Sequence, residues 1–101
     1  MGKLIRDLMP DIIERETGVR PKTRVLKEGK ELVRALKAKV VEEALEVQSA
    51  HKRKDVRIEL ADLHQAAESL RAALNISMRD LEGEIRRRQR VRGVFERRLS
   101  T

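Results

Sequence analysis

The sequence contains no cysteine, tryptophan or tyrosine, and Phe95 is its only aromatic residue. Without cysteine the chain can form neither disulfides nor thiolate metal sites, which is typical of a cytoplasmic protein. No apolar run approaches the roughly 18 residues of a membrane span, and no signal-peptide pattern opens the chain. We therefore expect a soluble, cytoplasmic protein with no membrane partner.

The core must consist of Leu, Ile, Val, Ala and Met side chains, in a chain of which 41% of the residues are charged. This composition favours packed helices over a β-sandwich. We predict one all-α domain, residues 1–101, with a helical-hairpin core and short N-terminal and C-terminal helices. Because a small aliphatic core buries little surface, we expect assembly into an oligomeric helix bundle, as a homodimer or a dimer of dimers.

Local signals predict four helices. Proline favours the first turn of a helix and glycine its end, so Pro10 and Gly18 bound a short N-terminal helix. Ser77 and Asp80 form a capping signal for the last helix, which Gly93 would end. In chain order, the other expected elements are an extended connector over 19–26, long helices over about 27–49 and 56–74 flanking a polar turn at 51–55, and a last helix over about 78–91.

Four carboxylates form two pairs, each with the spacing i, i+3: Glu43 with Glu46, and Glu59 with Asp62. Residues three apart lie on one face of a helix. Glu43 and Asp62, like Glu46 and Glu59, lie equally far from a point between positions 52 and 53. An antiparallel hairpin that turns at this point would bring all four acids to one level. Such a set of oxygen ligands suits Mg²⁺ or Mn²⁺.

A helical wheel at about 100° per residue places Glu43 and Glu59 inside the apolar stripes of the two long helices. A buried carboxylate is costly unless it is paired or metal-bound, so this position favours a metal site over a solvated helix face. A buried salt bridge to Lys39 or Arg71 could neutralise one of these carboxylates, but it would not explain why four acids meet at one level. The stripes are Leu36, Val40, Ala44 and Val47 in one helix and Val56, Leu60, Leu63, Ala67, Leu70 and Leu74 in the other. Apolar residues outside them, which need a second partner surface, are Val41, Leu45, Ile58, Ala61 and Ala72.

Three blocks of sequence carry a family resemblance: KLIRDLMPDIIE (3–14), the pair KVVEEALE (39–46) and ELAD (59–62), and RGVF (92–95). In order, they resemble the opening KLVRDKIPEIIE pattern, the EExxE and ExxD metal motifs and the closing RGGF of one family. This family is the MazG-like, all-α nucleoside triphosphate pyrophosphohydrolases, in particular the branch described as phosphoribosyl-ATP pyrophosphohydrolase-like. The blocks together span nearly the whole chain.

The resemblance implies an enzyme that binds Mg²⁺, for which Mn²⁺ can substitute, and hydrolyses the α–β phosphoanhydride bond of a nucleotide to a monophosphate and pyrophosphate. By position, it makes Glu43, Glu46, Glu59 and Asp62 the metal ligands. Glu42 would orient the attacking water, so Glu42 and Glu43 are the catalytic candidates. Metal ions would neutralise the triphosphate and lower the pKa of this water. A house-cleaning role against non-standard or excess nucleotides is what the branch suggests.

Several cations are candidates for contacts with the substrate's phosphates. Lys39 lies one turn before Glu43, so it either contacts phosphate or forms an i, i+4 ion pair with this acid. Lys3 and Arg6 belong to the opening block and are expected to reach phosphates, whereas Arg6 could instead pair with Asp7 or another acid.

The closing block makes Arg92 and Phe95 substrate-binding candidates, although Phe95 could simply anchor the core. Three residues depart from the family pattern. Leu8 replaces a lysine of the opening block, Val94 replaces the second glycine of the closing block, and Gln65 stands where an acid is often found. None of the three is a predicted metal ligand, so they bear on the choice of substrate more than on the reaction.

Two alternative functions remain. A phosphoribosyl-ATP pyrophosphohydrolase of histidine biosynthesis would share the same motifs. The net charge of +7 also allows a non-catalytic, helical nucleic-acid-binding protein, because basic runs attract polyphosphates. Without interleaved aromatic residues, a solvated helix face is the better interpretation of the C-terminal arginines, so we do not expect a nucleic-acid partner. These arginines are Arg86, Arg87, Arg88, Arg90, Arg92, Arg97 and Arg98.

Overall fold

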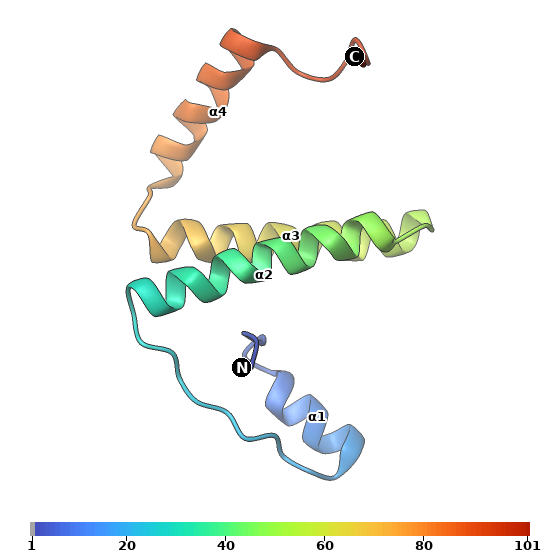
Figure 1. Cartoon of the computed structure of the whole chain (residues 1–101), viewed down its shortest axis with the longest axis vertical. Coiled ribbons are helices and arrows are strands. Elements are labelled where there is room, and N and C mark those ends of the chain that lie inside the picture. The colour runs from blue at the N-terminus through green and yellow to red at the C-terminus, as the bar shows by residue number, and fades with distance from the viewer. Residues whose placement is uncertain (1) are drawn as a thin grey trace.

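The computed structural model describes residues 2–101, and within this range it contains four α-helices and no strand (Figure 1). The all-α prediction is therefore confirmed. The helices are α1 (Met9–Thr17), α2 (Lys30–Ser49), α3 (Arg53–Ala73) and α4 (Met78–Arg92).

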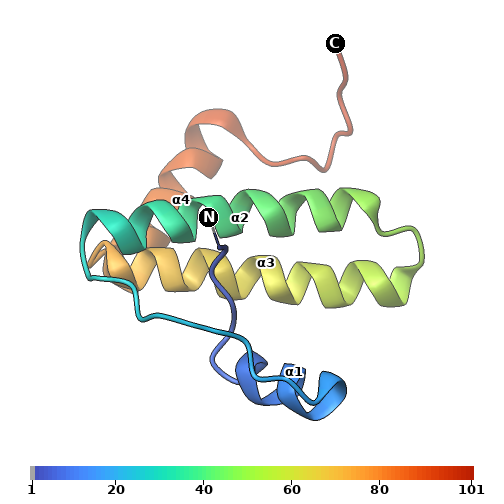
Figure 2. The same ribbon diagram turned by 60° about the horizontal axis from the view of Figure 1, so that its bottom comes forward.

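Helices α2 and α3 form the predicted antiparallel hairpin, and they lie side by side along their whole length (Figures 1 and 2). Among the described residues, they are the only two helices whose backbones pack together. The turn between them is residues 50–52, shorter than predicted, because α3 begins at Arg53 rather than near Val56. Asp55 lies in the first turn of α3, where the helix dipole favours an acidic side chain.

The ends of the other helices follow the local signals. Pro10 lies in the first turn of α1, and Gly18 ends that helix with φ 77°, a conformation that favours glycine. Gly29 has φ 88°, which explains why α2 begins at Lys30 and not at Lys27. The Ser77 hydroxyl accepts a hydrogen bond of 3.0 Å from the backbone N–H three residues later, as the capping signal predicts.

The core of the described chain is very small. Leu36 and Ala66 are its buried apolar residues, and Glu43 is its one buried charged residue. The face of α3 that turns toward α2 was predicted incorrectly in part, because Ala66 is buried while Leu60 is half exposed. This face includes small and polar side chains, which an apolar stripe does not reveal. Other stripe residues that lie exposed are Ala44, Ala67 and Leu74.

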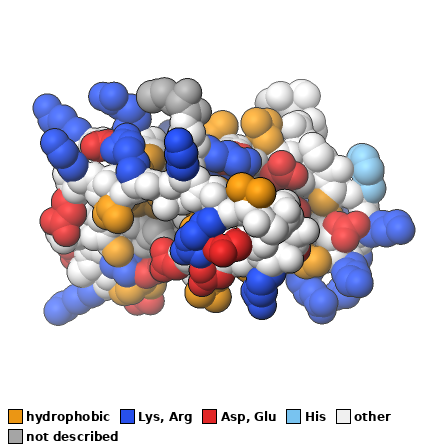
Figure 3. Space-filling view, turned by 90° about the horizontal axis from the view of Figure 1, so that it is seen from below, with side chains coloured by type: hydrophobic (Ala, Val, Ile, Leu, Met, Phe, Trp, Pro, Cys, Tyr) orange, Lys and Arg blue, Asp and Glu red, His pale blue; other side chains and the backbone are white. Residues whose placement is uncertain are grey.

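The two short helices stand apart from the hairpin. The N-terminal segment, residues 2–8, crosses the middle of the hairpin before α1 begins below it (Figure 2). At the far end of α3, α4 leads away from the hairpin into the C-terminal tail (Figure 1). Viewed from below, hydrophobic side chains are scattered among acidic and basic ones over this face (Figure 3). No helix in residues 2–101 is both long enough and apolar enough to span a lipid bilayer.

Truncation of Leu36 tests whether the hairpin is the folding core. Leu36 is 6% exposed, and removing a buried leucine leaves a cavity that costs about 2–5 kcal/mol. We expect Leu36→Ala to lower the free energy of unfolding by about this amount, measured by urea denaturation followed by circular dichroism. Leu99→Ala is the matched control, because Leu99 is 75% exposed in the tail. Equal effects of the two variants would contradict the assignment of the core.

Candidate metal centre

Three carboxylates converge between α2 and α3. Glu43 comes from α2, and Glu59 and Asp62 come from one face of α3, three residues apart. One oxygen atom of each carboxylate lies within 4.8 Å of the others. Carboxylate oxygens at such separations can close around one hard divalent cation, such as Mg²⁺ or Mn²⁺. We call Glu43, Glu59 and Asp62 the acidic cluster.

Glu46, the fourth predicted ligand, lies at the margin of the acidic cluster. Because the turn is residues 50–52, the hairpin is centred on His51. This register sets Glu43 level with Glu59 and leaves Glu46 nearer the turn. Glu46 is exposed, yet its negative charge still contributes to the raised pKa of Glu59. The structure thus brings three of the four predicted ligands together, with the fourth within electrostatic reach.

Glu43 is the most deeply placed member of the cluster, with 8% of its surface exposed. A carboxylate in this position needs a partner, since an unpaired buried charge is very costly. The partner in the structure is Lys39, whose Nζ lies 3.4 Å from Oε1 of Glu43. The i, i+4 ion pair considered as one role for Lys39 is therefore present. Arg71 does not take this part, because its guanidinium binds Glu68.

The pKa of Glu59 is raised above its ordinary value. Partial removal from water is the largest cause, followed by the negative charges of Asp62, Glu46 and Glu43. Both effects disfavour the ionised carboxylate. A cation bound between these groups would reverse the electrostatic effect, since an opposite charge nearby favours ionisation.

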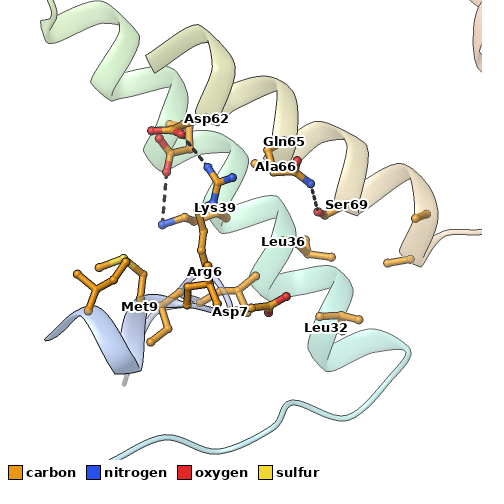
Figure 4. A pocket seen from close by; sticks show the side chains of 17 residues that line it. Arg6, Asp7, Met9, Leu32, Leu36, Lys39, Asp62, Gln65, Ala66 and Ser69 are labelled. Carbon is orange, nitrogen blue, oxygen red and sulfur yellow. Dashed lines mark hydrogen bonds and ion pairs between the residues drawn. The ribbon is translucent and has the colours of Figure 1, made fainter. Parts of the chain in front are cut away.

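The N-terminal segment brings two further cations to the hairpin. Lys3 Nζ lies 3.0 Å from Oε1 of Glu42, and Arg6 Nη1 lies 2.8 Å from Oδ1 of Asp62. Arg6 therefore pairs with a cluster acid rather than with Asp7. Figure 4 shows the side chains of Arg6, from the N-terminal segment, and of Lys39, from α2, pointing to the carboxylates. Three cations predicted to bind phosphate, Lys3, Arg6 and Lys39, thus lie beside the acidic cluster.

Glu42 is adjacent to the cluster on α2. Its carboxylate accepts hydrogen bonds from Lys3 at 3.0 Å and from Lys39 at 3.4 Å. The hydrogen bond from Lys3 is the main reason that the pKa of Glu42 is lowered, with the charge of Lys39 helping. Glu42 is therefore held in its ionised form as an acceptor for a hydrogen bond.

The two candidates from the closing block lie elsewhere in this chain. Arg92 ends α4, and Phe95 follows in the tail, where it is 95% exposed. The interpretation of Phe95 as a core anchor is therefore wrong. Since α4 packs against no other helix of the described residues, neither side chain reaches the acidic cluster of the same chain.

A pocket opens beside the acidic cluster, between the N-terminal segment, α1 and the hairpin (Figure 4). Its volume is about 840 Å³, and its walls are mainly apolar, with Leu32 and Leu36 on the α2 side. Gln65 and Ser69 of α3 also line it. The sequence indicated Gln65 only as a departure from the family pattern that bears on the choice of substrate, and it did not indicate Ser69. Their spacing from Asp62, three and seven residues along the same helix face, was the signal that could have found them.

Comparisons with models of protein families, with curated proteins and with solved structures find no match to this chain. The chemistry of the cluster and the resemblance of the sequence motifs therefore carry the assignment of a function.

Replacing Glu59 tests whether the cluster is under electrostatic strain. Because the folded-state pKa of Glu59 lies above its ordinary 4.5, ionisation of Glu59 destabilises the fold, and this cost appears as the pH rises above 4.5. We expect metal-free Glu59→Gln to be at least as stable as the wild type at about pH 7, and the two to converge below about pH 4. Chemical denaturation across this pH range measures the difference.

Glu42→Gln is the contrasting variant, because the pKa of Glu42 is lowered. The stabilisation from ionised Glu42 is present above pH 4.5, the ordinary pKa, and is lost as the pH falls through the lower folded-state pKa. This variant should therefore be less stable than the wild type near neutral pH.

A large loss of metal-free stability in Glu59→Gln would contradict the prediction of electrostatic strain in the cluster and would favour a purely structural ion-pair network.

Proposed function

We propose that this protein is a Mg²⁺-dependent nucleotide pyrophosphohydrolase that cleaves the α–β phosphoanhydride bond of a nucleoside triphosphate or related nucleotide. The observation that carries the proposal is the convergence of oxygen atoms of Glu43, Glu59 and Asp62 within 4.8 Å of one another. Two cations, Lys39 and Arg6, bind acids of this cluster. Oxygen ligands for a hard cation and positive charges for phosphate are the two requirements of this reaction. No nucleophilic Ser or Cys is needed.

Charge balance supports a divalent cation. The cluster and Glu42 are bound by three cations, Lys3, Arg6 and Lys39, and the charges of Glu46 and Asp55 also act on Glu59. The acids therefore exceed the cations. A Mg²⁺ or Mn²⁺ would offset much of this excess, and its ligands would come from Glu43, Glu59 and Asp62, with Glu46 nearby.

The reaction would add water to the α-phosphorus and expel pyrophosphate. A bound metal would neutralise the phosphates and lower the pKa of the attacking water. Glu42, which its lysine partners keep ionised, would accept a hydrogen bond from this water and orient it. Lys39 and Arg6 would turn from carboxylate to phosphate oxygens and stabilise the charge that develops on the leaving group. A house-cleaning role against unwanted nucleotides fits a small site of this kind.

Replacing Glu59 tests the metal site. Glu59→Gln removes one negative charge with little change of size, so metal affinity and turnover should both fall. We expect kcat/KM to drop roughly 10²–10³-fold, the loss typical of removing one electrostatic group from an active site. Pyrophosphate release should be measured with nucleoside triphosphates and phosphoribosyl-ATP, with and without Mg²⁺.

The matched control is Glu82→Gln, an exposed acid on α4, which should leave turnover unchanged. Near-normal activity of Glu59→Gln at saturating Mg²⁺ would contradict the metal site. A preference for phosphoribosyl-ATP over every triphosphate would assign the histidine-pathway reaction instead.

We also propose that the chain works as a homodimer or a dimer of dimers. It exposes 9330 Å², whereas a compact chain of 11.7 kDa exposes about 5,900 Å². Its radius of gyration is 17.0 Å, against about 13 Å for a compact domain of this length. The excess surface is roughly 3,400 Å² per chain, or about 6,800 Å² for two chains, which is beyond the roughly 2,000–5,000 Å² that most obligate interfaces bury over both partners.

The apolar residues predicted to lie outside the hairpin stripes are exposed, as a second partner surface requires. Val41 and Leu45 on α2 and Ile58 on α3 are the largest of them. We expect light scattering at micromolar concentration to give at least twice the chain mass of 11.7 kDa. Leu45→Arg should lower this mass, whereas Val25→Arg, in the connector, should not. A well-folded, active monomer would contradict the proposal.

A further inference from the structure

The side chains that line the pocket beside the acidic cluster are charged at one end and mainly aliphatic elsewhere. At one end lie the charged side chains of Arg6, Lys39, Glu43 and Asp62, while Asp7 lies apart from them, beside Met9 (Figure 4). The remainder is walled chiefly by aliphatic side chains from the N-terminal segment and the three nearest helices: Leu4, Met9, Leu32, Leu36, Ala66 and Ala73. Its volume of about 840 Å³ is in the range of small-molecule pockets, which are mostly apolar with a few placed polar groups. This pocket therefore suits a ligand with a charged end and a flat, weakly polar end.

Gln65 and Ser69 are the two uncharged polar side chains among the residues that line the pocket. They lie one turn apart on α3, and the Gln65 amide donates a hydrogen bond of 3.3 Å to the Ser69 hydroxyl. Figure 4 shows this pair farther along α3 from Asp62, away from the charged end. At 1.5 Å of rise per residue, Gln65 and Ser69 lie about 4.5 and 10.5 Å along the helix from Asp62. A ribose separates a base from its phosphates over a comparable span.

The bond to Ser69 orients the amide of Gln65. The amide oxygen remains free to accept a hydrogen bond, and the second N–H remains free to donate one. A side-chain amide in this arrangement pairs with the adjacent donor and acceptor on the edge of a nucleobase, as glutamine and asparagine do with adenine. The aliphatic wall supplies the apolar surface against which a base would lie.

We infer that the base of the nucleotide occupies the aliphatic part of this pocket, and that Gln65, held by Ser69, is the residue that determines base specificity. The inference rests on the proposed function, since it assumes that the phosphates lie at the acidic cluster. Gln65 touches the base and not the reacting atoms, so it acts on the choice of substrate and not on the chemical step.

The test compares kcat/KM for ATP, GTP, CTP and UTP in the wild type, Gln65→Leu and Ser69→Ala. Gln65→Leu keeps the size of the side chain and removes both hydrogen-bonding groups. We expect the ratio between the best and the worst base to shrink roughly tenfold or more, the value of one good bidentate contact. Ser69→Ala should shrink it by less, because the amide remains. Gln48→Leu is the matched control, because Gln48 is exposed like Gln65 but lies on α2 outside the residues that line the pocket, and it should preserve the ratio.

Inorganic tripolyphosphate, which has no base, separates this inference from the proposed function. Its inhibition constant in the presence of Mg²⁺ should be the same for the wild type and Gln65→Leu. Unchanged base ratios in Gln65→Leu, with hydrolysis intact, would overturn the inference alone. Failure of the wild type to hydrolyse any nucleotide would overturn the proposed function as well. A change in oligomer mass without a change in base ratio would assign the pocket to an interface between copies and overturn the inference.

Discussion

The placing of several carboxylates partly out of water at the middle of the hairpin is the constraint on which the site depends. Glu43 is buried, and partial removal from water, followed by the charges of Asp62, Glu46 and Glu43, disfavours the ionised form of Glu59. Such a group persists only where cations offset it. Lys39 provides one from within α2, one turn from Glu43. Two further cations, Lys3 and Arg6, come from the N-terminal segment that crosses the hairpin.

The N-terminal segment crosses the hairpin at the level of the acids, with Leu4 and Ile5 half-buried beside the pocket. Lys3 and Arg6 bind Glu42 and Asp62 there. Exposed ion pairs contribute at most about 1 kcal/mol each, so these two pairs are weak and reversible. Weak attachment suits residues that exchange one anionic partner for another. In the proposed reaction, the phosphates would replace the carboxylates as partners of these side chains.

The hairpin was predictable from sequence because its signals are local and periodic. The i, i+3 spacing of Glu59 and Asp62 places them on one face whatever the tertiary structure. Their position along the hairpin axis relative to Glu43 depends on the length of the turn. Because α3 begins at Arg53 and not near Val56, Glu46 lies at the margin of the acidic cluster. Wheel patterns cannot resolve such a shift, because a wheel gives the direction of each side chain around the helix axis and not its position along that axis.

Long-range pairs were beyond prediction for a different reason. Arg6 lies 56 positions from Asp62, and the sequence offers several other acids of equal charge, including its neighbour Asp7. Only the path of the chain decides between them. The proposed role of Gln65 in base specificity was also beyond prediction, because it depends on a pocket that the N-terminal segment helps to line. Sequence motifs therefore identified the charged end of the site, whereas the apolar end became visible only once the segment was placed across the hairpin.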